Sequence, residues 1–178
     1  VGNSVWSWTA ILGALRAGAT VVPISTMLRS AMVSKFLQDS AARFFVISQE
    51  WDQLALEAAA TTDVTNFRES EKAFDAGEPS LPQGSEVNAI LYPSDTCNII
   101  YSSGTTGQPK GIVHSHAARI GLALQLSLAF RMSNETRTLV TTPPHTNVTW
   151  AMMLTTILLG GTAFLMPHFE ASQVLQNV

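Results

Sequence analysis

The segment 101–111 constrains the fold more than any other part of this sequence. Its residues read YSSGTTGQPKG and include three glycines, four Ser or Thr residues, one proline and one lysine. Glycine lets the backbone turn sharply and brings its N–H groups close to a ligand, and successive N–H groups in such a turn form a concave anion site. Together with rotatable hydroxyl donors and the Lys110 ammonium, these groups suit a polyphosphate.

The residues on either side of this segment predict strands. Cys97–Tyr101 precedes the loop, and Ile112–His114 follows it. The loop therefore joins two strands, whereas a Walker A P-loop needs Gly, four residues and Gly-Lys-Ser/Thr at the start of a helix. Loop N–H groups, hydroxyls and Lys110 would bind the phosphates without a helix N-terminus. The alternative is a tight Ser/Gly hairpin turn that binds no ligand.

Composition narrows the class of protein. The formal net charge is −3, so electrostatics do not indicate nucleic acid as a partner. The one cysteine, Cys97, cannot form an internal disulfide, which fits a reducing compartment. Charged residues make up 13% of the chain, against about 25% in typical domains. Since the chain also begins Val1-Gly2-Asn3, we interpret it as a piece of a longer protein.

Strand and helix patterns alternate along the chain, which is typical of an α/β fold with a layered, mostly parallel sheet and flanking helices. The expected helices cover about 5–15, 30–40, 50–60, 148–159 and the residues from 170, with a further long helix after His116. The expected strands cover about 19–24, 43–47, 97–101, 112–114, 137–141 and 162–166. Apolar residues occur on nearly all faces of the helix after His116, so we expect that helix to be buried.

Residues 61–93 are polar, poorly periodic and acidic, and we expect a surface connection with room for short elements of its own. A docking surface is the functional alternative to a solvated loop. No Asp, Glu, Lys or Arg occurs between Thr138 and Phe169. A membrane span needs about 20 apolar residues, and threonines and Gly160-Gly161 interrupt this stretch, so we prefer a buried helix and strand of a soluble core.

The segment 101–111 resembles, throughout its length, the phosphate-binding signature of the adenylate-forming (AMP-binding) superfamily. That superfamily includes acyl-CoA synthetases, coumarate-CoA ligases, luciferases and peptide-synthetase adenylation domains. Arg16-Ala17-Gly18 and Val22-Pro23 also resemble an early region of these enzymes. The resemblance implies that residues 1–178 are an incomplete piece of the large N-terminal domain, with the C-terminal domain and its catalytic lysine absent. It also implies that this piece has negligible synthetase activity by itself.

The resemblance implies roles for particular residues. Lys110 would offset the charge of the β- and γ-phosphates and act in catalysis, and His145, after Pro143-Pro144, would lie on the carboxylate and acyl side. The residues expected to bind the nucleotide phosphates are Ser102, Ser103, Gly104, Thr105, Thr106, Gly107 and Lys110. An ordinary loop histidine is the alternative for His145. His114 and His116 are weak evidence for a metal site, and no metal-ligating residue is assigned.

The implied function is that of an ATP-dependent acid–CoA ligase fragment, with ATP, Mg²⁺ and CoA as cofactors or co-substrates. Its substrate would be a small carboxylic acid or a fatty acid. The protein would act in fatty acid metabolism in the cytoplasm and would have no membrane span. The alternatives are an adenylation domain that loads a carrier protein, a non-catalytic phosphate-binding fragment and a membrane-associated segment. The sequence leaves open which acid is activated, which thiol accepts it, and the oligomeric state.

Overall fold

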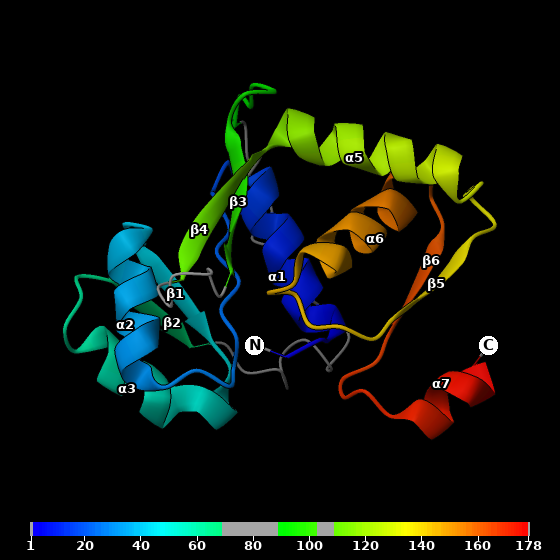
Figure 1. The fold of residues 1–178 in the computed structure, drawn as a ribbon. Coiled ribbons are helices and arrows are strands. Elements are labelled where there is room, and N and C mark those ends of the chain that lie inside the picture. The colour runs from blue at the N-terminus through cyan, green and yellow to red at the C-terminus, as the bar shows by residue number, and fades with distance from the viewer. Residues whose placement is uncertain (1, 69–88, 103–108, 178) are drawn as a thin grey trace, which may run out of the picture. The chain divides into compact units, whose positions relative to one another are not determined.

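The computed structural model describes residues 2–68, 89–102 and 109–177 and divides into two compact units. The first unit contains residues 24–68 of the described chain. The second contains residues 2–23 together with the described residues from 89 onward. Each unit has its own hydrophobic core, and Figure 1 shows the elements of both.

The first unit pairs two short parallel strands and packs two helices. Its elements are α2 (Ser30–Asp39), β1 (Phe44–Ile47), the 3₁₀ helix η1 (Gln49–Trp51), α3 (Asp52–Ala59) and β2 (Thr65–Arg68). The register of the strands runs from Phe44↔Thr65 to Ile47↔Arg68. Buried Val33 and Leu37 of α2 pack against Ala58 of α3. The sequence predicted α2, β1 and α3, but it did not predict the separate η1 before α3 or β2, which lies within the expected 61–93 connection.

The second unit carries the glycine-rich segment. Its elements are α1 (Val5–Arg16), β3 (Thr96–Ser102), β4 (Lys110–Ser115), α5 (His116–Ala129), β5 (Arg137–Val140), α6 (Asn147–Leu158), β6 (Thr162–Leu165) and α7 (Ala171–Asn177). Strands β3 and β4 are antiparallel, whereas β5 and β6 are parallel and connected through α6. Two of the three strand pairs in the described chain are therefore parallel. The α/β class predicted from the sequence is confirmed.

Helix α1 begins and ends where its sequence predicts. The Ser4 hydroxyl accepts a hydrogen bond of 3.1 Å from the Ser7 backbone N–H, which satisfies one free donor at the helix N-terminus. Gly18 adopts a φ of +81°, a conformation that favours glycine and turns the chain after the helix. Trp8 and Ile11 are buried and direct this helix onto the core.

The expected strand at 19–24 is wrong as a strand, because only Val21 pairs with the sheet. Its N–H donates to the Cys97 carbonyl at 3.1 Å, and its carbonyl accepts from the Ile99 N–H at 3.0 Å, a single parallel bridge. The next residue that would donate to β3 in a parallel ladder is Pro23, which has no N–H. The backbone pairing of this segment with β3 therefore ends after one bridge.

The core of the second unit lies between α1, α6 and the strands. Trp8 and Trp150 meet edge to face, with ring centroids 5.7 Å apart and an interplanar angle of 61°. The buried residues of this core are Trp8, Ile11, Cys97, Ile100, Val140, Trp150 and Met153. Helix α6, which contains no Asp, Glu, Lys or Arg, is confirmed as a core helix, since Trp150 and Met153 are buried on it.

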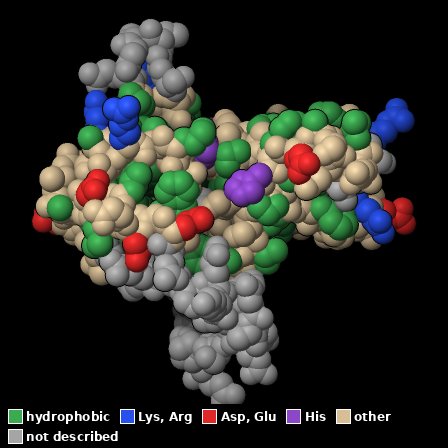
Figure 2. All heavy atoms as spheres, turned by 90° about the horizontal axis from the view of Figure 1, so that it is seen from below, with side chains coloured by type: hydrophobic (Ala, Val, Ile, Leu, Met, Phe, Trp, Pro, Cys, Tyr) green, Lys and Arg blue, Asp and Glu red, His purple; other side chains and the backbone are tan. Residues whose placement is uncertain are grey.

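Helix α5 differs from its prediction as a fully buried helix. Only Arg119 and Ala123, four residues apart, are buried on it, whereas Leu128 is 81% exposed and Phe130, just past its end, is 64% exposed. The helix packs on α6 and on the β3–β4 pair along one stripe, so apolar residues outside that stripe remain at the surface. Figure 2, a view from below, shows hydrophobic side chains at the surface with Asp, Glu, Lys and Arg side chains between and beside them.

Helices long and apolar enough to cross a membrane are absent from the described ranges 2–68, 89–102 and 109–177.

Candidate functional site

Strands β3 and β4 form the two sides of the glycine-rich segment. Their antiparallel register ends at the pair Ser102↔Lys110, so these two residues face each other where the segment begins and ends. The Lys110 side chain is exposed, and Ser102 is half-buried. The predicted phosphate-binding residues Ser103, Gly104, Thr105, Thr106 and Gly107 lie outside the described residues. The prediction that the segment joins two strands is confirmed.

Gly111 lets the two strands approach closely beside this segment. A Cβ atom added to Gly111 would lie 2.9 Å from Ile99 Cγ2 and 3.3 Å from the ring of Tyr101. Cβ atoms essentially never approach other heavy atoms within 3.0 Å. Position 111 therefore needs glycine if Ile99 and Tyr101 are to keep their places on the neighbouring strand.

The segment that carries His145 is a hydrogen-bonded turn between β5 and α6. The Pro143 carbonyl accepts from both the N–H and the hydroxyl of Thr146, each at 3.0 Å. The indole N–H of buried Trp150 donates to the Pro144 carbonyl at 2.6 Å. His145 thus lies in a turn that Thr146 closes by hydrogen bonds to Pro143 and that Trp150 of α6 binds at Pro144, even though two consecutive prolines precede it.

His145 is half-buried, and burial lowers its pKa from the usual 6.5. The imidazole is therefore neutral at pH 7. A neutral imidazole offers one N–H donor and one acceptor nitrogen, so His145 has the chemistry to orient a carboxylate or to close a substrate pocket.

Arg119 of α5 forms a buried polar cluster with residues of β3 and α6. Its side chain is 3% exposed. Its Nε donates to Asn98 Oδ1 and its Nη1 donates to Asn147 Oδ1, each at 2.8 Å. The guanidinium carbon also lies 5.3 Å from the centroid of the Trp150 ring, a cation–π contact. One side chain therefore contacts the strand that leads to Ser102 and the helix that follows His145.

The cluster contains nitrogens for which the described residues provide no hydrogen-bond partner. These are Asn98 Nδ2, His114 Nε2 and Arg119 Nη2, all buried. His114 lies opposite Asn98 in the β3–β4 register. Burial, reinforced by the nearby Arg119 cation, lowers the pKa of His114, and burial raises the pKa of the Cys97 thiol. Arg119 therefore carries the positive charge of this cluster among neutral neighbours.

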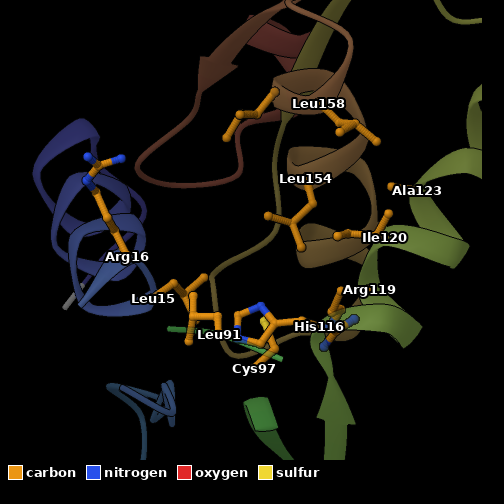
Figure 3. Close-up of a pocket in the computed structure, with 11 residues that line it drawn as sticks. Leu15, Arg16, Leu91, Cys97, His116, Arg119, Ile120, Ala123, Leu154 and Leu158 are labelled. Carbon is orange, nitrogen blue, oxygen red and sulfur yellow. The ribbon is translucent and has the colours of Figure 1, made fainter. Parts of the chain in front are cut away.

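A cavity of about 290 Å³ lies between α1, α5 and α6. Leucine, isoleucine and alanine side chains line most of it. Figure 3 shows Cys97, His116 and Arg119 together at one end and Leu158 at the other. Within the described part of the chain, no group of three His, Cys, Asp or Glu residues could hold a metal ion.

Sequence reasoning assigned Lys110 and His145 to the site but missed Arg119. A signal for it was present, since Arg119 is the one Asp, Glu, Lys or Arg residue of α5. It lies four residues before Ala123, on the stripe where the helix is buried. A lone charge on the buried stripe of an apolar helix must find polar partners, and the two asparagines supply them.

The family model described as AMP-binding enzyme matches residues 1–178. Among curated proteins, the chain is 40% identical to benzoate–CoA ligase of Thauera aromatica over 121 residues, which cover 65% of this chain and 23% of that protein. It is 28% identical to the long-chain-fatty-acid–CoA ligase FadD13 of Mycobacterium tuberculosis over 97% of this chain and 35% of that protein. It is also 29% identical to the nonribosomal peptide synthetase vlms of Lecanicillium over 89% of this chain and 2% of that protein.

Solved structures show the same fold. A long-chain-fatty-acid-CoA ligase of Archaeoglobus fulgidus superposes with a TM-score of 0.84 at 24% identity, covering 99% of this chain and 36% of that one. The N-terminal domain of FACL13 from Mycobacterium tuberculosis gives a TM-score of 0.79 at 26% identity, covering 98% of this chain and 44% of that one. The chain spans about a third or less of the curated relatives named above. It is a fragment of the N-terminal domain of an adenylate-forming enzyme and belongs to the AMP-binding enzyme family.

Proposed function

We propose that the protein to which residues 1–178 belong activates a carboxylic acid with ATP and transfers the acyl group to the thiol of CoA. In the first step a carboxylate oxygen attacks the α-phosphorus of ATP, which forms an acyl adenylate and releases pyrophosphate. In the second step the thiol sulfur attacks the acyl carbon, and AMP leaves. The observation that carries this proposal is the β3–β4 hairpin, whose connecting segment 101–111 matches the family's phosphate-binding signature.

The first step brings two anions together, so its transition state needs positive charge and hydrogen-bond donors around the phosphates. Lys110 provides an exposed ammonium at the last pair of the β3–β4 register, beside the connecting segment. Ser102, directly opposite, adds a hydroxyl donor. We assign the same phosphate-binding role to Ser103, Gly104, Thr105, Thr106 and Gly107 from their place in the signature. Mg²⁺, bound with ATP, would supply further countercharge.

His145 is proposed to lie on the acid side of the reaction. Its neutral imidazole has a donor for the carboxylate and adds no positive charge that would weaken the nucleophile. The hydrogen bonds of Thr146 and Trp150 to Pro143 and Pro144 fix the backbone on both sides of it. A fixed backbone lowers the ordering entropy that is lost when the substrate binds.

A second function has support from a separate observation. Peptide synthetases are among the relatives, at 29% identity for the Lecanicillium protein. An adenylation domain performs the same first step and then loads a carrier protein instead of CoA. We favour CoA because benzoate–CoA ligase is the relative with the higher identity, 40%. Because of that relative and FadD13, aromatic and fatty acids are the first substrates to test. We also propose that the reaction takes place in the cytoplasm.

The experiment uses the full-length protein. Acid-dependent exchange of labelled pyrophosphate into ATP tests the first step with a panel of fatty acids, benzoates and amino acids. Formation of the acyl-CoA thioester from the best acid then tests the second step. Exchange without thioester formation favours the carrier-protein alternative, and no exchange with any acid contradicts the proposal.

Variants connect the result to the hairpin. Lys110→Ala should lower the exchange rate by about 10²-fold or more, because it removes a charge that stabilises the transition state. Lys35→Ala changes a lysine of α2 in the first unit and is the matched control. Equal activity of the two variants would contradict the role of Lys110. Residues 1–178 expressed separately should have negligible synthetase activity.

A further inference from the structure

Arg119 connects two segments that have different roles in the proposed function. One leads to the phosphate-binding residues, and the other carries His145 on the acid side. Through Nε, Arg119 holds Asn98, which lies in the same strand as Ser102. Through Nη1 it holds Asn147, two residues after His145. The two hydrogen bonds are 2.8 Å each and leave the planar guanidinium between β3 and α6. A guanidinium has a rigid fork of donors, so its two bonds fix the relative position of both acceptors.

A second route leads from Arg119 to the same segment. The guanidinium packs over the Trp150 ring. The indole N–H of Trp150 donates to the carbonyl of Pro144, which directly precedes His145. Arg119 is therefore linked to the backbone on both sides of His145. Asn147 is the link after His145, and Trp150, through its bond to Pro144, is the link before it.

Stability does not explain why a cation occupies this place. Arg119 is 3% exposed, and its Nη2 has no hydrogen-bond partner among the residues that the structure describes, so its burial has a desolvation cost that the two asparagines offset only in part. Replacing buried ionic groups by apolar side chains of similar volume is often neutral or stabilising. The neighbouring cavity is lined mainly by apolar side chains and would accommodate such a residue. This points to geometry as the role of Arg119.

We propose that Arg119 is a positioning residue, which holds the strand leading to Ser102 and the turn bearing His145 at the separation that the adenylation step requires. The inference rests on the proposed function. Arg119 acts through Asn98, Asn147 and Trp150 and does not itself contact the substrates. Small errors in the relative position of reacting groups lower kcat strongly, and a misplacement of about 1 Å can cost about 10²-fold.

The test compares kinetic constants of the full-length protein and its variants in the pyrophosphate-exchange assay. Arg119→Met should lower kcat by about 10²-fold while the KM values for ATP and the acid change by less than about threefold. Arg137→Met, at an exposed position of β5, is the matched control and should leave kcat unchanged. A normal kcat in Arg119→Met, measured per folded molecule, overturns the proposal.

The exposed Asn147 gives variants that do not depend on replacing a core residue. Asn147→Ala removes the acceptor of Nη1 and should lower kcat, whereas Asn147→Asp keeps an acceptor oxygen and should restore it. Because both residues act through one contact, the Arg119→Met/Asn147→Ala double variant should lose no more than Arg119→Met alone. Losses that multiply in the double variant would overturn the proposal.

Hydrogen exchange separates this inference from the proposed function. In Arg119→Met the backbone amides of residues 96–102 and of the turn at 142–147 should exchange faster than in the unmodified protein and in Arg137→Met. Unchanged exchange in both segments overturns the positioning role whatever the enzyme assays give. If the unmodified protein activates no acid but exchange rises in both segments, the proposed function fails and the positioning role of Arg119 is upheld.

Discussion

The indole N–H of Trp150 donates a hydrogen bond of 2.6 Å to the carbonyl oxygen of Pro144. Trp150 is fully buried, and Pro144 directly precedes His145. This bond connects the core of the second unit to the residue we assign to the acid side of the site.

Replacement of Trp150 by Phe keeps an aromatic ring but leaves the Pro144 carbonyl without its donor. An unsatisfied buried acceptor costs about 1–3 kcal/mol, so we expect a loss of about 2 kcal/mol in the free energy of unfolding and a higher KM for the acid. Urea unfolding and initial-rate kinetics measure the two effects. Trp8→Phe is the matched control, because the Trp8 indole donates to Asn3 and not to the His145 segment.

Trp8→Phe should therefore destabilise the protein by a similar amount without a change in the KM for the acid. A normal acid KM in Trp150→Phe would show that the bond to Pro144 supports the fold and not the placement of His145.

Acid should destabilise the fold through two histidines. Burial lowers the folded-state pKa of His145 and of His114, while the unfolded chain keeps a value near 6.5. As the pH falls through 6.5, the unfolded state binds these protons first, so the unfolding free energy decreases. We expect it to decrease between pH 7.5 and 5.5, and to decrease less steeply in His145→Asn and in His114→Asn. Denaturant titrations at several pH values measure this slope, and an unchanged slope in either variant contradicts burial of that imidazole in its neutral form.

Gly111→Ala should separate the strands beside the glycine-rich segment. The new Cβ would meet Ile99 Cγ2 at 2.9 Å, and Ile is branched at Cβ and cannot easily turn away. Overpacking of this kind costs about 1–3 kcal/mol. Gly121→Ala is the control, since a Cβ there meets no atom within 4 Å and alanine favours helix α5 by up to about 1 kcal/mol.

Thermal unfolding should therefore shift in opposite directions for these two glycine variants. A lower melting temperature for Gly121→Ala as well would contradict the open space around this position.

Asn3 holds three groups of the second unit together. Its Nδ2 donates to the carbonyls of Val140 at 3.0 Å and Met166 at 3.1 Å, and its Oδ1 accepts from the Trp8 indole at 3.1 Å. Asn3→Ala leaves the Met166 carbonyl and the Trp8 indole N–H unsatisfied, whereas the Val140 carbonyl keeps the Met166 N–H as a donor at 3.0 Å. With about 1–3 kcal/mol for each unsatisfied buried group, we expect a loss of about 3 kcal/mol or more in urea unfolding, against almost none for exposed Asn134→Ala. Equal stability of the two variants would show that other atoms satisfy these groups.

Local sequence signals were sufficient for most helices and strands. The N-cap at Ser4 and Gly18 after the helix defined α1, and runs of β-branched and apolar residues defined β3 and β5. These signals depend on neighbours in the sequence, so one chain without homologues reveals them. The α/β class followed from their alternation.

Predictions that depended on partners distant in the sequence were less successful. The run at 19–24 has strand composition, but pairing stops after Val21 because Pro23 has no donor for β3. Helix α5 has an apolar composition, but only the stripe through Arg119 and Ala123 packs on described residues. The residues of the candidate site show the same difference between local signals and distant partners. Lys110 and His145 stood out through nearby glycines and prolines, whereas Arg119 gained its partners from β3 and α6, 21 and 28 residues away.

The antiparallel register from Asn98↔His114 to Ser102↔Lys110 runs without a shift and limits how these strands can change in length. Alternate residues of a strand point to opposite faces, so a one-residue insertion in either strand would exchange the faces of all side chains beyond it. An insertion in β3 between Asn98 and Ser102 would then move Asn98 and Ser102 to opposite faces of the strand pair. A one-residue insertion or deletion within residues 98–102 or 110–114 should therefore disrupt the pairing of Ser102 with Lys110, so the two strands that carry the phosphate-binding segment are fixed in length.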